Sequence, residues 1–152
     1  MPGYHAKGDQ TLTTSNTTAL TIASNATTAN RNTVDEYIMT IQLTPSDSQI
    51  SWTIQRCTVL GTNTAVTPAG ADDGADRAAQ ALIGKNHTVE PTYTANAFII
   101  EAMNINARAT YRWVAAPGAA IITPATAASG IGFMALHASR TEDFGVQSHW
   151  FE

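Results

Sequence analysis

The chain contains four histidines that lie far apart in the sequence: His5, His87, His137 and His149. None belongs to a His-x-His or His-x-x-x-His pair, the local spacing that places two imidazoles on one metal ion. A metal site would need the fold to bring these side chains together, with a carboxylate such as Asp143 as a further ligand. We therefore expect no metal ion and no other cofactor.

The thiol and one acidic segment favour structural roles. Cys57 lies in a predicted strand, where a buried thiol acts as a small hydrophobic group, and as the only cysteine it excludes an internal disulfide. The segment Asp72-Asp-Gly-Ala-Asp76 places three carboxylates in a loop that could bind calcium. It lacks the longer Asp-x-Asp-x-Asp-Gly frame and its closing Glu, so a solvated acidic loop is favoured.

Other catalytic patterns are weak. A glycosidase needs two facing carboxylates, and no pair stands out among Glu90, Glu101, Glu142 and Asp143. The glycines from 70 to 74 are not followed by the Lys-Ser/Thr of a phosphate-binding loop. The aromatic residues recur at strand spacing, which favours core packing over a sugar-stacking platform. We predict that the protein is not an enzyme, and we name no catalytic residue.

The elements that must position these residues are mostly strands. In the segment 37–43 every second residue is apolar, and Ile50, Trp52 and Ile54 repeat this period of two. The apolar positions then shift by one toward Cys57, which predicts a bulge. A Pro45 turn between the two segments predicts a hairpin of 37–43 with 50–60.

The segment 109–114 alternates in the same way and predicts a central strand, which the Pro117-Gly118 turn ends. Short strands separated by Pro, Gly and Asn turns are typical of an antiparallel β-sandwich, here jelly-roll-like. The other strands expected in this half of the chain are 88–93, 97–103, 119–123, 131–140 and 145–151.

The 152 residues suit one domain. Residues 1–10 carry few apolar side chains and predict a flexible, extended N-terminal arm, so the sandwich domain would span 11–152. Within it, 61–90 is a loop and helix excursion, with one short helix over 76–83 capped by Gly84. Two interpretations of this excursion stay open: it contacts a partner, or its helix plugs one open end of the sandwich.

The charge pattern limits the possible partners. Charged residues make up only 13% of the chain and the formal net charge is −4. A nucleic-acid surface would need clustered Lys and Arg, and the eight basic residues are scattered. No apolar run is long enough to cross a membrane, and the N-terminus does not look like a signal peptide. We expect neither nucleic acid nor membrane as a partner, and synthesis in a host cytoplasm.

The run Arg108-Ala-Thr-Tyr-Arg-Trp-Val-Ala-Ala-Pro-Gly118, followed by Pro124, Gly130-Ile-Gly-Phe133 and Trp150-Phe-Glu152, resembles the C-terminal part of small structural proteins of tailed bacteriophages. These are head decoration or other auxiliary virion proteins. The resemblance covers roughly residues 91 to 152 and consists of turn and core residues. It implies a capsid decoration protein that binds the major capsid protein on the outer surface of the virion and stabilises the assembled head.

Families of this kind commonly act as homotrimers, so the resemblance also implies self-association. The alternative is a glycan-binding or host-recognition β-sandwich of a phage fibre or tail, and a metal-binding or enzymatic sandwich is the third hypothesis. The expected partner contacts lie on the arm and the excursion: Tyr4, His5, Asp72, Asp73 and Arg77.

Overall fold

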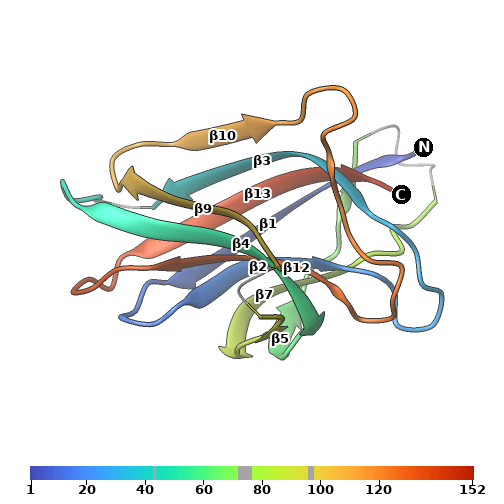
Figure 1. Ribbon diagram of the computed structural model, residues 1–152, viewed down its shortest axis with the longest axis horizontal. Helices are drawn as coiled ribbons and strands as arrows, with labels where there is room; N and C mark the ends of the chain where they lie inside the picture. The colour runs from blue at the N-terminus through green and yellow to red at the C-terminus, as the bar shows by residue number, and fades with distance from the viewer. Residues whose placement is uncertain (43, 72–76, 96–97) are drawn as a thin grey trace.

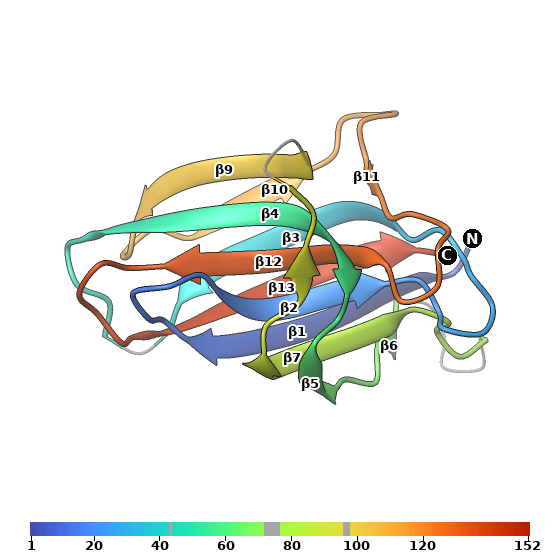
Figure 2. The ribbon, with the colours of Figure 1, turned by 60° about the horizontal axis from the view of Figure 1, so that its bottom comes forward.

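The computed structural model describes residues 1–42, 44–71, 77–95 and 98–152. These residues form thirteen β-strands in two antiparallel sheets that stack face to face (Figures 1 and 2). The protein is therefore an all-β sandwich, as the sequence predicts. Among the described residues, no helix is long and apolar enough to cross a membrane.

The first sheet, sheet A, contains both ends of the chain. Its strand order is β10-β3-β13-β1-β6, and β11 also pairs with β3. The first and last long strands of the chain are neighbours, paired from Gly3↔Phe151 to Thr11↔Asp143. The strands are β1 Gly3–Thr11, β3 Thr33–Ile41, β6 Ala69–Gly70, β10 Tyr111–Val114, β11 Ile121–Ile122 and β13 Asp143–Phe151.

The second sheet, sheet B, has the order β5-β7-β2-β12-β4-β8, and β9 also pairs with β4. Both β8 and β9 pair with β4, at different positions along it. The strands are β2 Thr17–Ala23, β4 Gln49–Val59, β5 Thr62–Ala65, β7 Leu82–Val89, β8 Thr92–Tyr93, β9 Ile99–Asn106 and β12 Gly130–Leu136.

The core lies between the sheets and follows the predicted alternation. Tyr37, Met39 and Ile41 face inward from β3, and Trp52 and Ile54 face them from β4. Each large apolar side chain buried in this way contributes about 1.5–3 kcal/mol. The predicted bulge between Ile54 and Cys57 is not found in β4, which pairs with β12 without a shift from Ser51 to Cys57. The shift in its pairing with β9 leaves Ile100 of β9 as the extra residue, and the extra residue of β4, Thr58, follows Cys57 in the pairing with β8.

The expected flexible arm is not observed. Residues 3–11 form β1, which pairs along its whole length with β13, and the side chains of Tyr4 and Ala6 are buried in the core. The apolar content of this segment is low because glycine and polar residues occupy its outer face. Pairing with a distant strand, rather than its own composition, orders it.

The expected helix over 76–83 is also wrong for its described part. Residues 77–80 have no regular structure, and Leu82 and Ile83 join β7 opposite Ala23 and Ile22. Two helical turns are only marginally stable by themselves, so pairing with β2 outweighs the local helix propensity. Gly84 is a residue of β7 rather than a helix cap.

Two predicted strand relationships differ in the structure. The segments 37–43 and 50–60 do not form a hairpin, because β3 belongs to sheet A and β4 to sheet B. Each contributes one apolar face to the same core from opposite sides. The segment 109–114, expected to be central, contains the short strand β10 at the edge of sheet A, where Tyr111 and Trp113 are half-buried.

Candidate functional site

The outer face of sheet A brings together four ionisable side chains near the end of the sandwich where both termini lie (Figure 1). We call His5, Asp35, Glu36 and His149 the histidine patch. His5 and His149 are directly opposite each other on β1 and β13, and their rings lie 4.4 Å apart between centroids. The fold therefore pairs two of the four histidines, which the sequence separates by most of its length.

A bulge places both acidic residues beside His149. The pairing of β13 with β3 shifts between His149 and Trp150, so that Glu36 is opposite His149 while Val34 is opposite Trp150. Asp35 is the extra residue, and its Oδ1 lies 2.6 Å from His149 Nδ1. Without this irregularity, strict alternation would place Asp35 and Glu36 on opposite faces of the sheet.

The electrostatics of the patch follow from these contacts. Partial burial, followed by the neighbouring His149, lowers the pKa of His5. The pKa of Glu36 is lowered chiefly by the hydrogen bond that Arg112 Nε donates to its Oε1 over 2.6 Å. Near neutral pH the patch therefore holds an ionised Glu36 and an uncharged His5.

The patch is a surface rather than a small-molecule pocket. Its hollow has a volume of about 50 Å³ and is lined by His5, Glu36, Ile38, Gln147, Ser148 and His149. Ligand pockets are usually several hundred Å³, so this hollow has room for ordered water but not for a substrate. In the described part of the chain, no three His, Cys, Asp or Glu side chains are placed to hold a metal ion.

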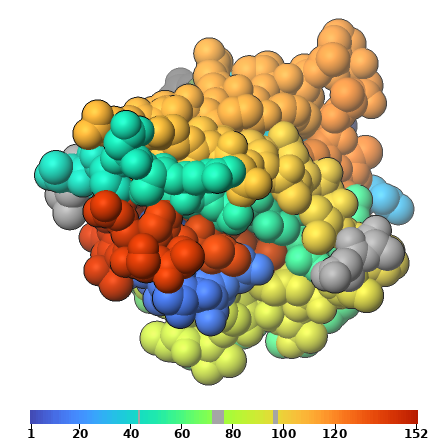
Figure 3. All heavy atoms as spheres, turned by 60° about the vertical axis from the view of Figure 1, so that its left-hand side comes forward, coloured from blue at the N-terminus to red at the C-terminus, as the bar shows by residue number. Residues whose placement is uncertain are grey.

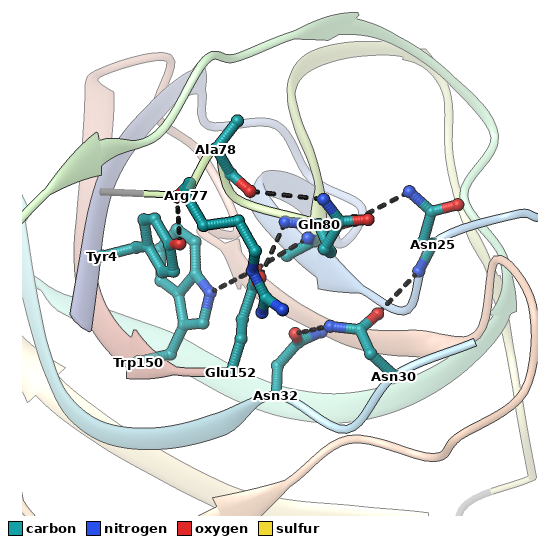
Figure 4. A network of polar contacts seen from close by, with 10 residues as sticks. Tyr4, Asn25, Asn30, Asn32, Arg77, Ala78, Gln80, Trp150 and Glu152 are labelled. Atoms are coloured by element: carbon teal, nitrogen blue, oxygen red, sulfur yellow. Dashed lines mark hydrogen bonds and ion pairs between the residues drawn. The ribbon is translucent and has the colours of Figure 1, made fainter. Parts of the chain in front are cut away.

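The two expected contact residues in residues 1–10, Tyr4 and His5, lie on opposite faces of β1. His5 lies in the histidine patch, on the outer face. Tyr4 points the other way, is only 3% exposed and packs against Trp150, so it is not available to a partner. The Tyr4 hydroxyl donates a 2.5 Å hydrogen bond to the carbonyl of Arg77 (Figure 4). This bond connects β1 to the 61–90 segment.

Of the expected contacts in the 61–90 segment, Arg77 lies at the same end of the sandwich as Tyr4. The side chain of Arg77 is 61% exposed, and one guanidinium nitrogen lies 3.9 Å from the Glu152 carboxylate. Arg77 can therefore reach a partner. Asp72 and Asp73 lie outside the described residues.

Glu152 fixes the segment that follows Arg77 (Figure 4). Its side chain is 1% exposed, and its two oxygens accept hydrogen bonds of 2.7 Å from the backbone N–H groups of Gln80 and Ala81. A carboxylate that accepts two backbone N–H groups is well stabilised when buried. The C-terminal residue of the chain therefore anchors the approach to β7.

Sheet B has a different outer face, because the chain covers it. Residues 88–95, which we call the strap, cross the sheet in front of β12 and β4 (Figure 2). The ring of Tyr93 lies over Gly132, where a Cβ atom would collide with it. The Thr18 hydroxyl donates to Glu90 Oε2 over 2.5 Å and lies 2.5 Å from the Tyr93 hydroxyl, which donates to it.

The remaining histidines and the thiol have structural surroundings. His87 is buried at the edge of the strap, with Nδ1 3.1 Å from the carbonyl of Thr18, and burial lowers its pKa. His137 is buried elsewhere and accepts a hydrogen bond from the Ser139 N–H. Cys57 is opposite Tyr93 where β4 pairs with β8, and burial raises the pKa of its thiol to about 11. It is therefore inert, as the sequence suggests.

Figure 3 shows the opposite end of the sandwich, where the 137–142 loop lies close to the segment that follows Thr44. Two larger hollows lie along this loop, one of them beside Gln42 and Thr44. Their volumes are about 320 and 300 Å³. Their lining contains no histidine or cysteine and consists of Gln42, Thr44, Ser139, Arg140, Thr141, Glu142 and Asp143. The side chains of these hollows are polar and do not form a nucleophile with a base.

The sequence analysis missed Asp35, Glu36 and Arg112 as members of the site. No spacing in the sequence relates them to His5 or His149, because their proximity depends on strand order and on one bulge. No known protein-family model, curated protein sequence or solved structure matches the chain.

Proposed function

We propose that the protein is a non-enzymatic structural protein of a phage virion, most specifically a capsid decoration protein. The observation that carries this proposal is the outer face of sheet A, which is open and shallow and contains the histidine patch. A macromolecular surface fits a face of this shape, whereas a small substrate needs a deeper pocket.

The composition of this face supports a protein partner. Val114 and Ile122 are exposed apolar side chains, and the strand register places them on the outer face of sheet A beside Glu36 and Thr33. Arg112 and Glu36 are paired with each other. When a partner covers such a surface, the free-energy cost of removing its charges from water is small, because the charges are already paired with each other and the other groups are apolar.

Decoration would stabilise the head by linkage. A protein that binds the assembled shell, and not the separated subunits of the major capsid protein, shifts the equilibrium toward the intact shell. Because many copies of the protein bind each particle, the individual contact with the capsid does not have to be tight. In this proposal the protein is made in the host cytoplasm, is located on the capsid surface, and can act as a homotrimer.

A jelly-roll-like topology is part of the proposal. Its support is that consecutive strands alternate between the sheets: β1 and β3 lie in sheet A, and β2 and β4 lie in sheet B. The resemblance of residues 91–152 to virion proteins points in the same direction.

The test is to mix the purified protein with undecorated, expanded capsid shells, pellet the shells and count bound copies per capsid subunit. We expect saturation at a fixed ratio, near one copy per subunit or one trimer per three-fold position. Coated shells should also resist heat better. The absence of co-pelleting would contradict decoration and would favour the glycan-binding alternative, for which a glycan array is the next measurement.

Two matched variants locate the contact. Val114 on sheet A and Val89 in the strap are exposed to a similar degree, 56% and 58%. Val114→Glu should reduce the bound copies about tenfold or more, since it places a charge in the proposed contact, while Val89→Glu should not. Equal loss in both variants, or loss only in Val89→Glu, would exclude the face of sheet A as the contact.

A further inference from the structure

The contact between His5 and His149 is the feature of the histidine patch that the proposed function leaves unused. The two imidazole rings face each other from neighbouring strands, with 4.4 Å between their centroids. Both side chains are partly buried on the outer face of sheet A. Histidine is the side chain whose ordinary pKa lets its charge change between pH 5 and 8. Two histidines on a contact surface can therefore make the contact depend on pH.

The carboxylates of the patch lie closer to His149 than to His5. Asp35 Oδ1 is 2.6 Å from His149 Nδ1, and Glu36 is opposite His149 in the pairing of β3 with β13. His5 lies one strand further away, because β13 separates β1 from β3. A positive charge on His149 is therefore balanced by a carboxylate in direct contact. Among the described residues, a positive charge on His5 is balanced only by the same two carboxylates at a greater distance.

The other charged side chains near His5 do not favour its protonated form. Lys7 lies two residues further along β1 on the same face and is positive. Arg112, on β10, is paired with Glu36 and offsets the negative charge of this carboxylate. On the other side of β1, the residue of β6 opposite His5 is the uncharged Ala69.

The free protein therefore has an uncharged His5 at neutral pH. Burial and the neighbouring His149 lower the pKa of His5, and they outweigh the attraction of Glu36 and Asp35. A partner that covers His5 removes the water that remains around the ring, which lowers this pKa further. The proton and the partner then oppose each other, since each binds more tightly when the other is absent.

His5 lies within the surface that the proposed contact covers. Four outward residues, each opposite the next, form one row across β10, β3, β13 and β1: Val114, Glu36, His149 and His5. Neighbouring strands are about 4.8 Å apart, so the row spans roughly 14 Å. A standard interface buries about 800 Å² of each partner, which is wide enough to include both ends of this row. A contact centred on this face therefore includes both the exposed Val114 and His5.

We propose that the contact on the outer face of sheet A is controlled by pH, and that protonation of His5 in mild acid weakens the binding of the partner. This inference rests on the proposed function, because it concerns the regulation of the same contact. Above about pH 6.5 His5 is uncharged and the partner binds at full strength. As the pH falls below this value, the free protein takes up a proton that the contact must expel, so the affinity decreases.

The test repeats the capsid pelleting experiment at pH 7.5 and at pH 5.5 and measures a dissociation constant at each pH. His5→Gln keeps a polar side chain that cannot gain a charge. His87→Gln is the matched control, because the pKa of His87 is also lowered but this residue is buried at the edge of the strap on sheet B. Titration of the capsid itself affects all three proteins equally. Thermal unfolding at both pH values checks that each protein is folded.

We expect the dissociation constants of the native protein and of His87→Gln to rise about threefold or more between pH 7.5 and pH 5.5, whereas that of His5→Gln stays nearly constant. Binding of the native protein at pH 7.5 with an affinity that does not depend on pH would overturn the inference and leave decoration in place. So would an equal pH dependence in His5→Gln. Absence of binding at both pH values would contradict the proposed function itself, and this inference with it.

Discussion

In both sheets every second side chain points outward, but the outward side chains of sheet A are exposed to solvent, whereas many of those of sheet B are covered by the strap. On sheet A the outward polar residues stay at the surface and pair with one another, as in His149 with Asp35 and Arg112 with Glu36. On sheet B the strap crosses the outward residues, so that Thr18 is fully buried with Glu90 and Tyr93 as its partners. A polar contact should therefore contribute much more stability on sheet B than on sheet A.

The largest expected difference concerns two outward glycines on β12 and β13. Gly132→Ala should lower the free energy of unfolding by about 2–3 kcal/mol, because the new methyl group would collide with the Tyr93 ring under the strap. At Gly145 the new methyl group would lie 2.5 Å from the Nε2 end of the Gln42 side chain, which can shift, so for Gly145→Ala we expect a change within about 0.5 kcal/mol. Urea unfolding of both variants measures the two changes in the free energy of unfolding. Equal effects would contradict the comparison.

A second pair of variants removes one hydroxyl from each face. Thr18→Val leaves the half-buried Glu90 and Tyr93 without their shared partner and should cost about 2 kcal/mol. Thr40→Val on β3 removes a hydroxyl whose contacts, to Ile41 and Thr110, are long and partly exposed, and should cost less than about 0.5 kcal/mol. If both variants unfold at the same urea concentration, the strap does not isolate Thr18 from water.

The two faces should also differ in their response to mild acid. The pKa values of His5 and His87 are both lowered in the folded protein, so that the unfolded chain binds protons more readily. Their contribution to stability is therefore present above about pH 6.5 and is lost as the pH falls from there through the folded pKa values.

We expect the melting temperature to fall between pH 7.5 and 5.5. His87→Gln should remove more of this dependence than His5→Gln, since His87 is the more deeply buried of the two. The matched measurement is the melting temperature of each variant at both pH values. A larger effect of His5→Gln would indicate that repulsion from His149 on the open face outweighs burial under the strap.

The smallest expected effect is that of the exposed ion pair on sheet A. Arg112→Gln removes the partner of Glu36, but this pair is in water and is screened by salt. The melting temperature should stay unchanged at physiological ionic strength. A clear drop that salt does not reduce would show that the open face has a more structured polar network than its exposure suggests.

Several features of the fold could be read from local pattern. The alternation of Tyr37, Met39 and Ile41 predicts an inward face, and so does that of Ile50, Trp52 and Ile54. These features depend only on neighbours along the chain, so a single sequence is sufficient.

The errors concern relationships between distant segments. Residues 3–11 have a weak pattern, and they are a strand because β13 pairs with them across the length of the chain. The local sequence around Leu82 and Ile83 fits a short helix, but these residues pair with β2 and form part of sheet B. Within the candidate site, only His5 was named among the expected contacts, because the register of β1, β13 and β3 decides what lies beside it.

The sequence by itself therefore determined the class of the protein: an all-β fold with low charge, in which alternating residues face a common core. The period of two is a local property of the extended backbone, so any chain with this pattern forms half-buried strands. The tertiary structure decided which strands are neighbours, that β1 is part of the sheet, that the strap covers one face, and that His5 meets His149. Those outcomes depend on contacts between residues far apart in the chain, whose register no local pattern specifies.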